Sequence, residues 1–287
     1  MSHSHVAALP LEVSGWVTLG CVVLLAGYLL GLRHYGPIFA PADRPATTRQ
    51  MVAFVAGVLV LWVALASPLH ALGERTLLSA HLLQHLLLGL LAPPLLLIGM
   101  PRWLAELAVH PPVIRRVLAV VTRPWLSVGL FSLLLIVLHL PVSIAAFAAG
   151  GLLHSAAHGL LLAAGFAVWL PLVSPVPAVV PRPSAGIRAL TLFALSIVPT
   201  VPASALTLMQ RSPYLVYDGA SQALGISPLH DLWAAGLLAK VGGSVALWTT
   251  AIVLFFRWAA ETDRRERHLA AVLPAGSAAC PPDPSHP

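Results

Sequence analysis

The chain has 287 residues, of which 58% are hydrophobic and only 9% are charged, with a mean hydropathy of +0.88. Soluble domains carry roughly 25% charged residues, so this composition excludes a soluble globular protein and indicates an integral membrane protein. The net charge of +6 does not indicate nucleic-acid binding, because the arginines are spread between apolar runs and form no basic stripe with interleaved aromatic residues.

Seven apolar runs are long enough, or nearly so, to cross a membrane as helices, which takes about 20 residues. In chain order they are approximately residues 13–32, 50–67, 77–99, 124–141, 151–172, 186–208 and 230–258. The third run contains Pro93-Pro94 and the sixth contains Pro199 and Pro202. These prolines should kink their helices and free backbone carbonyls that need partners inside the bundle. The predicted fold class is therefore all-α, a polytopic bundle of seven transmembrane helices.

We predict three parts along the chain. Residues 1–12 form a short outer tail, residues 13–258 form the membrane domain, and residues 259–287 form a disordered cytoplasmic tail with little periodicity. No Lys or Arg precedes the first apolar run, so we expect this run to be a retained helix and not a cleaved signal peptide. Tryptophans near the predicted span boundaries, Trp169 among them, are expected to act as interfacial anchors.

The basic residues predict the orientation in the membrane. Thirteen of the sixteen Lys and Arg residues lie in or beside the connections on one side: Arg33, Arg44, Arg49, Arg102, Arg115, Arg116, Arg123, Arg182, Arg188, Arg257, Arg264, Arg265 and Arg267. Only Arg75 and Arg211 fall on the opposite side, and the one lysine, Lys240, lies within the seventh run. Because cytoplasmic loops carry the excess of basic residues, we expect the N-terminus outside and the C-terminus inside.

Two pairs of histidines lie inside the predicted spans. His81 and His85 are in the third run and His154 and His158 are in the fifth, each pair four residues apart. On a helix this spacing sets both rings on one face, about 5.4 Å apart along the axis. Ionisable side chains inside a membrane span are expensive and mark functional sites. The predicted orientation places both pairs in the outer half of the membrane.

Further polar residues are expected at the same depth. His139 ends the fourth run, His70 precedes the third, and His230 and Asp231 begin the seventh, whereas no Asp or Glu lies at mid-depth. Imidazole suits copper, zinc, iron and nickel, while a magnesium or calcium site would need carboxylates. The sequence therefore predicts an outward-facing metal site.

The candidate metal ligands are His81, His85, His139, His154, His158 and His230. Five further residues are candidates for a supporting role: Gln84, His70, Met209, Asp231 and Lys240. Gln84 could orient an imidazole, and Met209 could offer a thioether to Cu(I). Each has a plainer interpretation, such as an interhelical hydrogen bond for Gln84, packing for Met209, or a helix cap on the seventh helix for Asp231.

Three alternatives remain open at this point. The same histidines could ligate haem between facing helices, with small residues such as Gly89 and Gly159 forming its groove. They could belong to a copper transporter, which would need a polar path beyond Lys240. They could also be hydrogen-bonded histidines of an assembly scaffold without metal. A zinc protease is disfavoured, because Leu82 stands where the His-Glu-x-x-His motif requires glutamate.

The stretch from Ser79 to Leu88, continuing through Ala92-Pro93-Pro94 to Pro101, resembles the signature of the polytopic CtaG family of cytochrome c oxidase assembly factors. Supporting matches are Leu138-His139-Leu140-Pro141, Trp169-Leu170-Pro171-Leu172 and Ser227-Pro228-Leu229-His230-Asp231. They follow one another from about residue 70 to residue 258, so the resemblance covers most of the chain.

This resemblance implies a non-enzymatic protein of the bacterial inner membrane that helps to build a haem-copper oxidase by handling copper at the outer face. The implied partners are oxidase subunits, membrane lipids and a periplasmic copper chaperone. One departure matters: the family motif often reads His-Met-x-Gln-His-Met, and Leu82 and Leu86 replace both methionines here. Copper binding in this chain would rest more on imidazole.

Overall fold

The structure is a computed structural model that describes residues 12–40, 46–148 and 151–272. The described residues contain helices and no strand, which confirms the all-α fold class. The chain divides into two compact units, residues 1–247 and residues 248–287. Unit 1 contains every candidate site residue.

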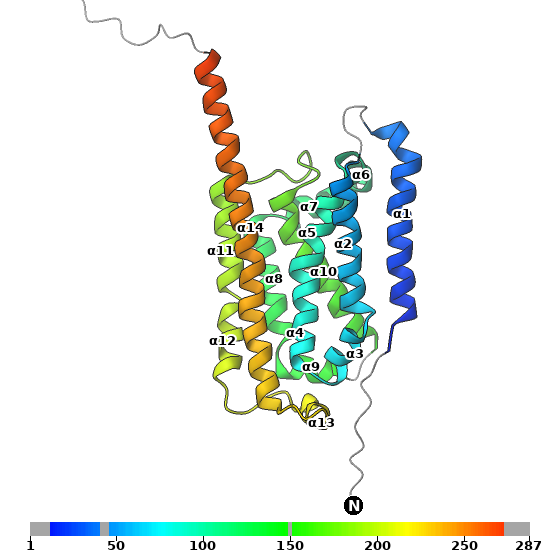
Figure 1. Ribbon diagram of the computed structural model, residues 1–287, viewed down its shortest axis with the longest axis vertical. Coiled ribbons are helices and arrows are strands. Elements are labelled where there is room, and N and C mark those ends of the chain that lie inside the picture. The colour runs from blue at the N-terminus through cyan, green and yellow to red at the C-terminus, as the bar shows by residue number, and fades with distance from the viewer. Residues whose placement is uncertain (1–11, 41–45, 149–150, 273–287) are drawn as a thin grey trace, which may run out of the picture. The chain divides into compact units, whose positions relative to one another are not determined.

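Unit 1 is a bundle of long helices that run side by side (Figure 1). They are α1 (Gly15–Phe39), α2 (Thr48–Leu65), α4 (Leu78–Leu86) with the π-helical turn η1 (Leu87–Leu91) and α5 (Ala92–Gly99), α8 (Pro124–Leu138), α10 (Leu152–Val173), α11 (Ala185–Ile197), α12 (Thr200–Leu208) and the first part of α14 (Pro228–Val272). Among the described residues, six spans are long and apolar enough to cross a membrane. The count is seven if α7 (Pro112–Val121) and α8, which are bent by 79° at their junction, make one span.

Some helix ends differ from the prediction. The fourth helix ends at Leu138 and not at residue 141, because Pro141 begins a separate helix, α9 (Pro141–Ala148). The last helix continues to Val272, so residues 259–272, which we predicted to be disordered, are helical. An i, i+4 ion pair between Arg267 and Asp263, 2.8 Å apart, supports this polar segment. Residues 1–11 and 273–287, most of the two predicted tails, lie outside the described residues.

Short helices that the sequence did not predict close the two ends of unit 1. At one end, here called the histidine end, lie α3 (Pro68–Arg75), α9, the 3-10 turn η2 (Leu215–Tyr217) and α13 (Asp218–Ala223). At the other, the arginine end, lie α6 (Arg102–Ala108) and α7. The chain between α2 and α4 therefore folds over the end of the bundle where the third span begins.

The spans Leu78–Gly99 and Leu152–Val173 form the centre of the bundle, with 56% and 50% of their apolar windows buried, against 11% in α1. Pro93 has no N–H, so the carbonyl of Gly89 lacks its helical donor. The indole Nε1 of Trp169 donates to that carbonyl at 3.2 Å. The freed carbonyl thus has a partner inside the bundle, as the proline pair predicted, while Trp169 is 1% exposed and is not the interfacial anchor we expected.

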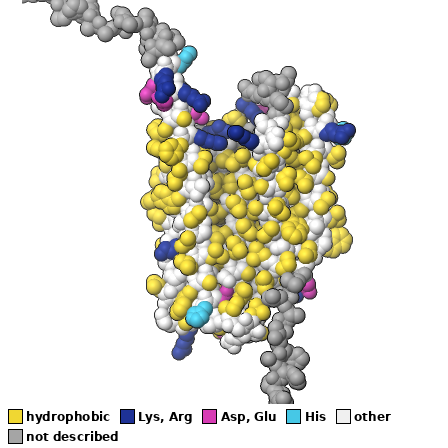
Figure 2. All heavy atoms as spheres, viewed as in Figure 1, with side chains coloured by type: hydrophobic (Ala, Val, Ile, Leu, Met, Phe, Trp, Pro, Cys, Tyr) yellow, Lys and Arg dark blue, Asp and Glu magenta, His cyan; other side chains and the backbone are white. Residues whose placement is uncertain are grey.

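Large hydrophobic side chains face outward along most of the long helices of unit 1. Figure 2 shows these side chains over the middle of the visible face, with Lys and Arg mainly at its margins. An apolar belt around several spanning helices is the surface that a bilayer requires. The protein is therefore a multi-pass membrane protein.

Candidate metal site

Asp231, at the start of α14, caps the helix that carries the first histidine pair. The N-cap residue of α4, Leu77, offers no side-chain acceptor. The buried carboxylate of Asp231 accepts hydrogen bonds from the backbone N–H of Leu78 at 2.7 Å and of Ser79 at 3.2 Å, and from the Ser79 hydroxyl. We predicted a cap on its own helix or a role in binding, and the structure instead places this charge at the positive end of α4.

Replacing Asp231 with alanine should lower the stability of the protein. The change leaves the buried backbone N–H of Leu78 without its acceptor, at a cost of about 1–3 kcal/mol, and removes the acceptor of the half-buried N–H of Ser79 as well. Thermal unfolding in detergent, followed by tryptophan fluorescence, measures the effect. Asp263→Ala is the control, because Asp263 forms an exposed ion pair of little energetic value. Equal melting temperatures of the two variants would contradict the capping role.

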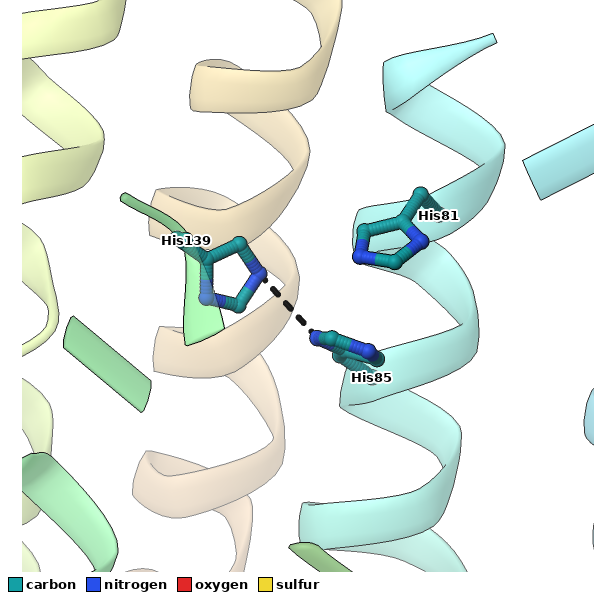
Figure 3. A group of neighbouring side chains, drawn as sticks. All are labelled: His81, His85 and His139. Atoms are coloured by element: carbon teal, nitrogen blue, oxygen red, sulfur yellow. Dashed lines mark hydrogen bonds between the residues drawn. The ribbon is translucent and has the colours of Figure 1, made fainter. Parts of the chain in front are cut away.

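Three imidazoles meet where α4 faces the end of α8. The His81 and His85 rings lie 4.2 Å apart by their centroids and are 2% and 4% exposed. His139, the residue after α8, donates its Nδ1–H to the carbonyl of Leu135 at 2.6 Å and places Nε2 3.1 Å from Nδ1 of His85 (Figure 3). One nitrogen from each ring lies within 4.8 Å of the other two. His81 and His85 are buried and His139 is half-buried; we call the three residues the buried triad.

His81 is the least satisfied member of the triad. Neither of its ring nitrogens has a hydrogen-bond partner among the described residues, although the side chain is buried. A buried polar group without a partner costs about 1–3 kcal/mol. An imidazole with a free lone pair beside two others is the arrangement that a transition-metal ion can use. The residues of the triad therefore fit a bound metal ion.

The second pair, His154 and His158, joins the same cluster from α10. Their Nε2 atoms are 3.1 Å apart, and the side chains are buried. The His158 ring lies 5.3 Å from that of His85, and the His154 ring lies 6.0 Å from that of His81. The structure thus brings five of the six candidate ligands into one cluster.

Glu74, which sequence reasoning did not select, touches this cluster from α3. Its Oε1 lies 2.9 Å from Nδ1 of His154 and 3.2 Å from Nε2 of His70. The hydrogen bond with His154 holds the pKa of Glu74 below its ordinary value, while burial lowers the pKa of His70. Glu74 is therefore a carboxylate, and His70 a neutral imidazole, near pH 7. The sequence signal that could have identified Glu74 is its i, i+4 spacing from His70 after the helix-starting Pro68.

Close backbone packing positions Glu74. A Cβ added to Gly73 would lie 3.0 Å from both the Cα and the N of His81, so α3 rests directly on α4. Gln84, fully buried on α4, places Nε2 2.8 Å from Nδ1 of His70. This contact between α4 and α3 agrees with both interpretations that we considered for Gln84, the orientation of an imidazole and an interhelical hydrogen bond.

Two tyrosines form hydrogen bonds to backbone carbonyls of the site. Tyr214 donates its hydroxyl to the carbonyl of His139 at 2.8 Å, and Tyr217 donates to the carbonyl of Gly73 at 2.9 Å. Burial raises the pKa of both phenols, so both remain donors. These residues come from the connection between α12 and α14, which sequence reasoning left without a role.

The remaining candidates lie outside the cluster. His230 is exposed and its ring contacts that of Trp233, with centroids 5.6 Å apart. Met209 and Lys240 instead line an apolar cavity of about 300 Å³ between α4, α8, α12 and α14, whose wall includes His85 and His139. His230 is set apart because it is exposed and its one ring contact among the described residues is with Trp233.

Fold and site together define a multi-pass membrane protein with a buried cluster of imidazoles at one end of its helical bundle. A family model described as cytochrome c oxidase caa3 assembly factor (Caa3_CtaG) matches residues 26–261. The chain belongs to this family, as its motifs predicted. Neither the curated proteins nor the solved structures give a match.

Proposed function

We propose that this assembly factor carries copper on its buried triad and supplies it to the cytochrome c oxidase as that enzyme is built. The observation that supports a metal ion is the pair of unpartnered nitrogens on buried His81, next to nitrogens of His85 and His139 within 4.8 Å. Copper is the cargo of this reaction, and the protein needs no catalytic step to bind and release it.

The chemistry of the triad favours the cuprous ion. Three neutral imidazoles contribute no negative charge, so a bound ion keeps its full charge in a buried, largely apolar setting. Burying one positive charge costs less than burying two. Imidazole is also a good ligand for copper, whereas the oxygen ligands of calcium or magnesium are missing from the triad.

The geometry disfavours the haem and transporter alternatives. The nitrogens of His85 and His139 lie 3.1 Å apart, which leaves no space for a porphyrin plane between them. About one turn beyond His85, at Gly89, Phe131 and Leu161 fill the interior, both 2% exposed or less. A polar path from the triad towards the arginine end is therefore not found in the described parts of the chain.

The predicted orientation completes the proposal. With the N-terminus outside, the histidine end faces the periplasm of the bacterial inner membrane. Copper would then arrive from a periplasmic chaperone and leave to an oxidase subunit on that side. The apolar cavity, with His85 and His139 in its wall, is the place where a membrane-embedded part of the oxidase could approach the ion.

Replacing His85 or His139 with alanine should remove most of the copper that the purified protein holds. Each change takes away one of three ligands, so competition with a coloured Cu(I) chelator under reducing conditions should show an affinity more than about 100-fold weaker. Metal analysis gives the content, and oxidase activity in a complemented deletion strain gives the function.

His230→Ala is the matched control, because His230 lies at the same end of the bundle but outside the cluster. It should bind copper as the unchanged protein does. Equal copper content in all three variants would overturn the proposed site.

A further inference from the structure

The buried triad needs a route by which a metal ion reaches it from solvent. His81 and His85 are 2% and 4% exposed, so an ion cannot meet them directly. The side chains of Glu74 and His70 are 22% and 25% exposed, and both touch the cluster. They are therefore more accessible than the four buried histidines of the cluster: His81, His85, His154 and His158.

We infer that His70, Glu74 and His154 form a loading port, a transient cation site that captures the metal ion from solvent and passes it to the buried triad. This inference rests on the proposed function, because the triad is the destination of the ion. The port would take a transition-metal cation such as Cu(I), for which it offers one carboxylate and two imidazoles.

The contacts of Glu74 suit such a port. One carboxylate oxygen lies 2.9 Å from a nitrogen of His154 and 3.2 Å from a nitrogen of His70, so a cation at Glu74 has two imidazoles within reach. A partly exposed carboxylate also attracts cations and raises their local concentration. Glu74 is the one acidic residue that contacts the cluster among the described residues.

A continuous series of imidazoles leads inward from the port. Nε2 of His154 is 3.1 Å from Nε2 of His158, whose ring lies 5.3 Å from that of His85. His81 lies beside this series, 6.4 Å from His158 by ring centroids. An ion can therefore exchange imidazole ligands stepwise from Glu74 to the triad.

The other opening near the triad is unsuited to an arriving cation. The cavity beside His85 and His139 is lined mostly by apolar side chains, and its one charged lining residue is the cation Lys240. Leaving water for such a surface costs an ion free energy, and the ammonium group repels it. The two openings thus differ in charge, and only the one at Glu74 favours cations.

Rotation of the Gln84 side-chain amide would let His70 either donate a hydrogen bond to Glu74 or bind the ion. With the amide N–H donating to Nδ1 of His70, as the 2.8 Å contact has it, the Nε2–H of His70 faces Glu74. The ring proton of His70, which is 25% exposed, can leave Nε2 to solvent while Nδ1 takes one up. A half turn of the amide then lets Oε1 accept from the Nδ1–H, and the Nε2 lone pair is free for the ion. The buried Oε1 of Gln84 has no hydrogen-bond partner in the present arrangement, so this oxygen loses no hydrogen bond when the amide rotates.

The test measures the rate of copper transfer from a coloured Cu(I) chelator to the purified protein by stopped flow. Glu74→Gln should slow loading by about tenfold or more, because it removes the charge that concentrates cations. Release of copper back to solvent uses the same port, so it should slow in proportion. The equilibrium affinity of the triad should stay within a few-fold of the unchanged protein. The loading rate should also lose most of its dependence on ionic strength.

Glu106→Gln is the control, since Glu106 is an exposed carboxylate paired with Arg102 at the arginine end, and Glu74→Asp should restore part of the rate. An unchanged loading rate in Glu74→Gln would overturn the port. So would a loss of affinity as large as the loss of rate, which would make Glu74 a structural support of the triad. If the unchanged protein holds no copper at equilibrium, the proposed function itself fails.

Discussion

His81→Leu should abolish copper binding and at the same time raise the melting temperature of the metal-free protein. Both ring nitrogens of His81 are buried without a partner among the described residues. Leucine has a similar volume and no polar atom, so the variant loses a desolvation penalty of about 1–3 kcal/mol. It also loses one of three copper ligands. If His81 destabilises the metal-free protein and binds copper, its replacement should therefore remove copper binding and raise the melting temperature.

The plainer interpretation, in which His81 only supports the fold, predicts the reverse. A histidine that holds two helices together by hydrogen bonds would destabilise the protein when replaced by leucine. His154→Leu serves as the contrasting variant, because His154 lies 2.9 Å from the carboxylate of Glu74. Its loss leaves a half-buried charge with one partner fewer, so this variant should melt at a lower temperature than the unchanged protein.

Melting of each variant is measured in detergent with and without Cu(I). Copper should stabilise the unchanged protein and leave His81→Leu unaffected, since a ligand stabilises only a state that binds it. A lower melting temperature for metal-free His81→Leu, or an equal shift by copper in both proteins, would assign His81 to the fold.

Local sequence patterns predicted the parts of this protein that depend on neighbouring residues. Apolar runs of membrane-spanning length located the long helices, and the i, i+4 spacing placed His81 beside His85 and His154 beside His158. The prolines predicted freed backbone carbonyls, because each lost hydrogen bond lies within one helix, and the carbonyl of Gly89 is one of them. The alternation of the spans then brought the two pairs to the same end.

Contacts between distant segments could not be predicted in this way. Asp231 caps a helix that begins 153 residues before it, and Tyr217 binds a carbonyl 144 residues away. Glu74 reaches the cluster because α3 packs on α4. His230 is exposed and contacts Trp233 instead of the cluster. The position of a residue along its helix follows from the sequence, whereas the neighbours that its side chain meets are decided by packing between helices.

Gly165→Ala should strongly lower the stability of the protein, because α10 packs closely at this position. A Cβ at this position would lie 2.8 Å from the carbonyl oxygen of Gly89 and 2.9 Å from Cγ of Pro93. Neither atom moves easily, because one is backbone and the other is in a proline ring. Overpacking costs about 1–3 kcal/mol, and pushing α10 away also strains the hydrogen bond of Trp169 to Gly89.

Gly159→Ala on the same helix is the matched control. No atom lies within 4 Å of a Cβ added there, so alanine should leave stability unchanged or raise it by about 0.5–1 kcal/mol through its better helix propensity. Thermal unfolding of the two variants side by side separates packing from propensity. Because α10 also carries His154 and His158, Gly165→Ala should weaken the link between port and triad and slow copper loading, while Gly159→Ala loads normally. Equal melting temperatures would show that α10 and the π-helical turn of the third span are not packed as tightly as Gly165 and Gly89 indicate.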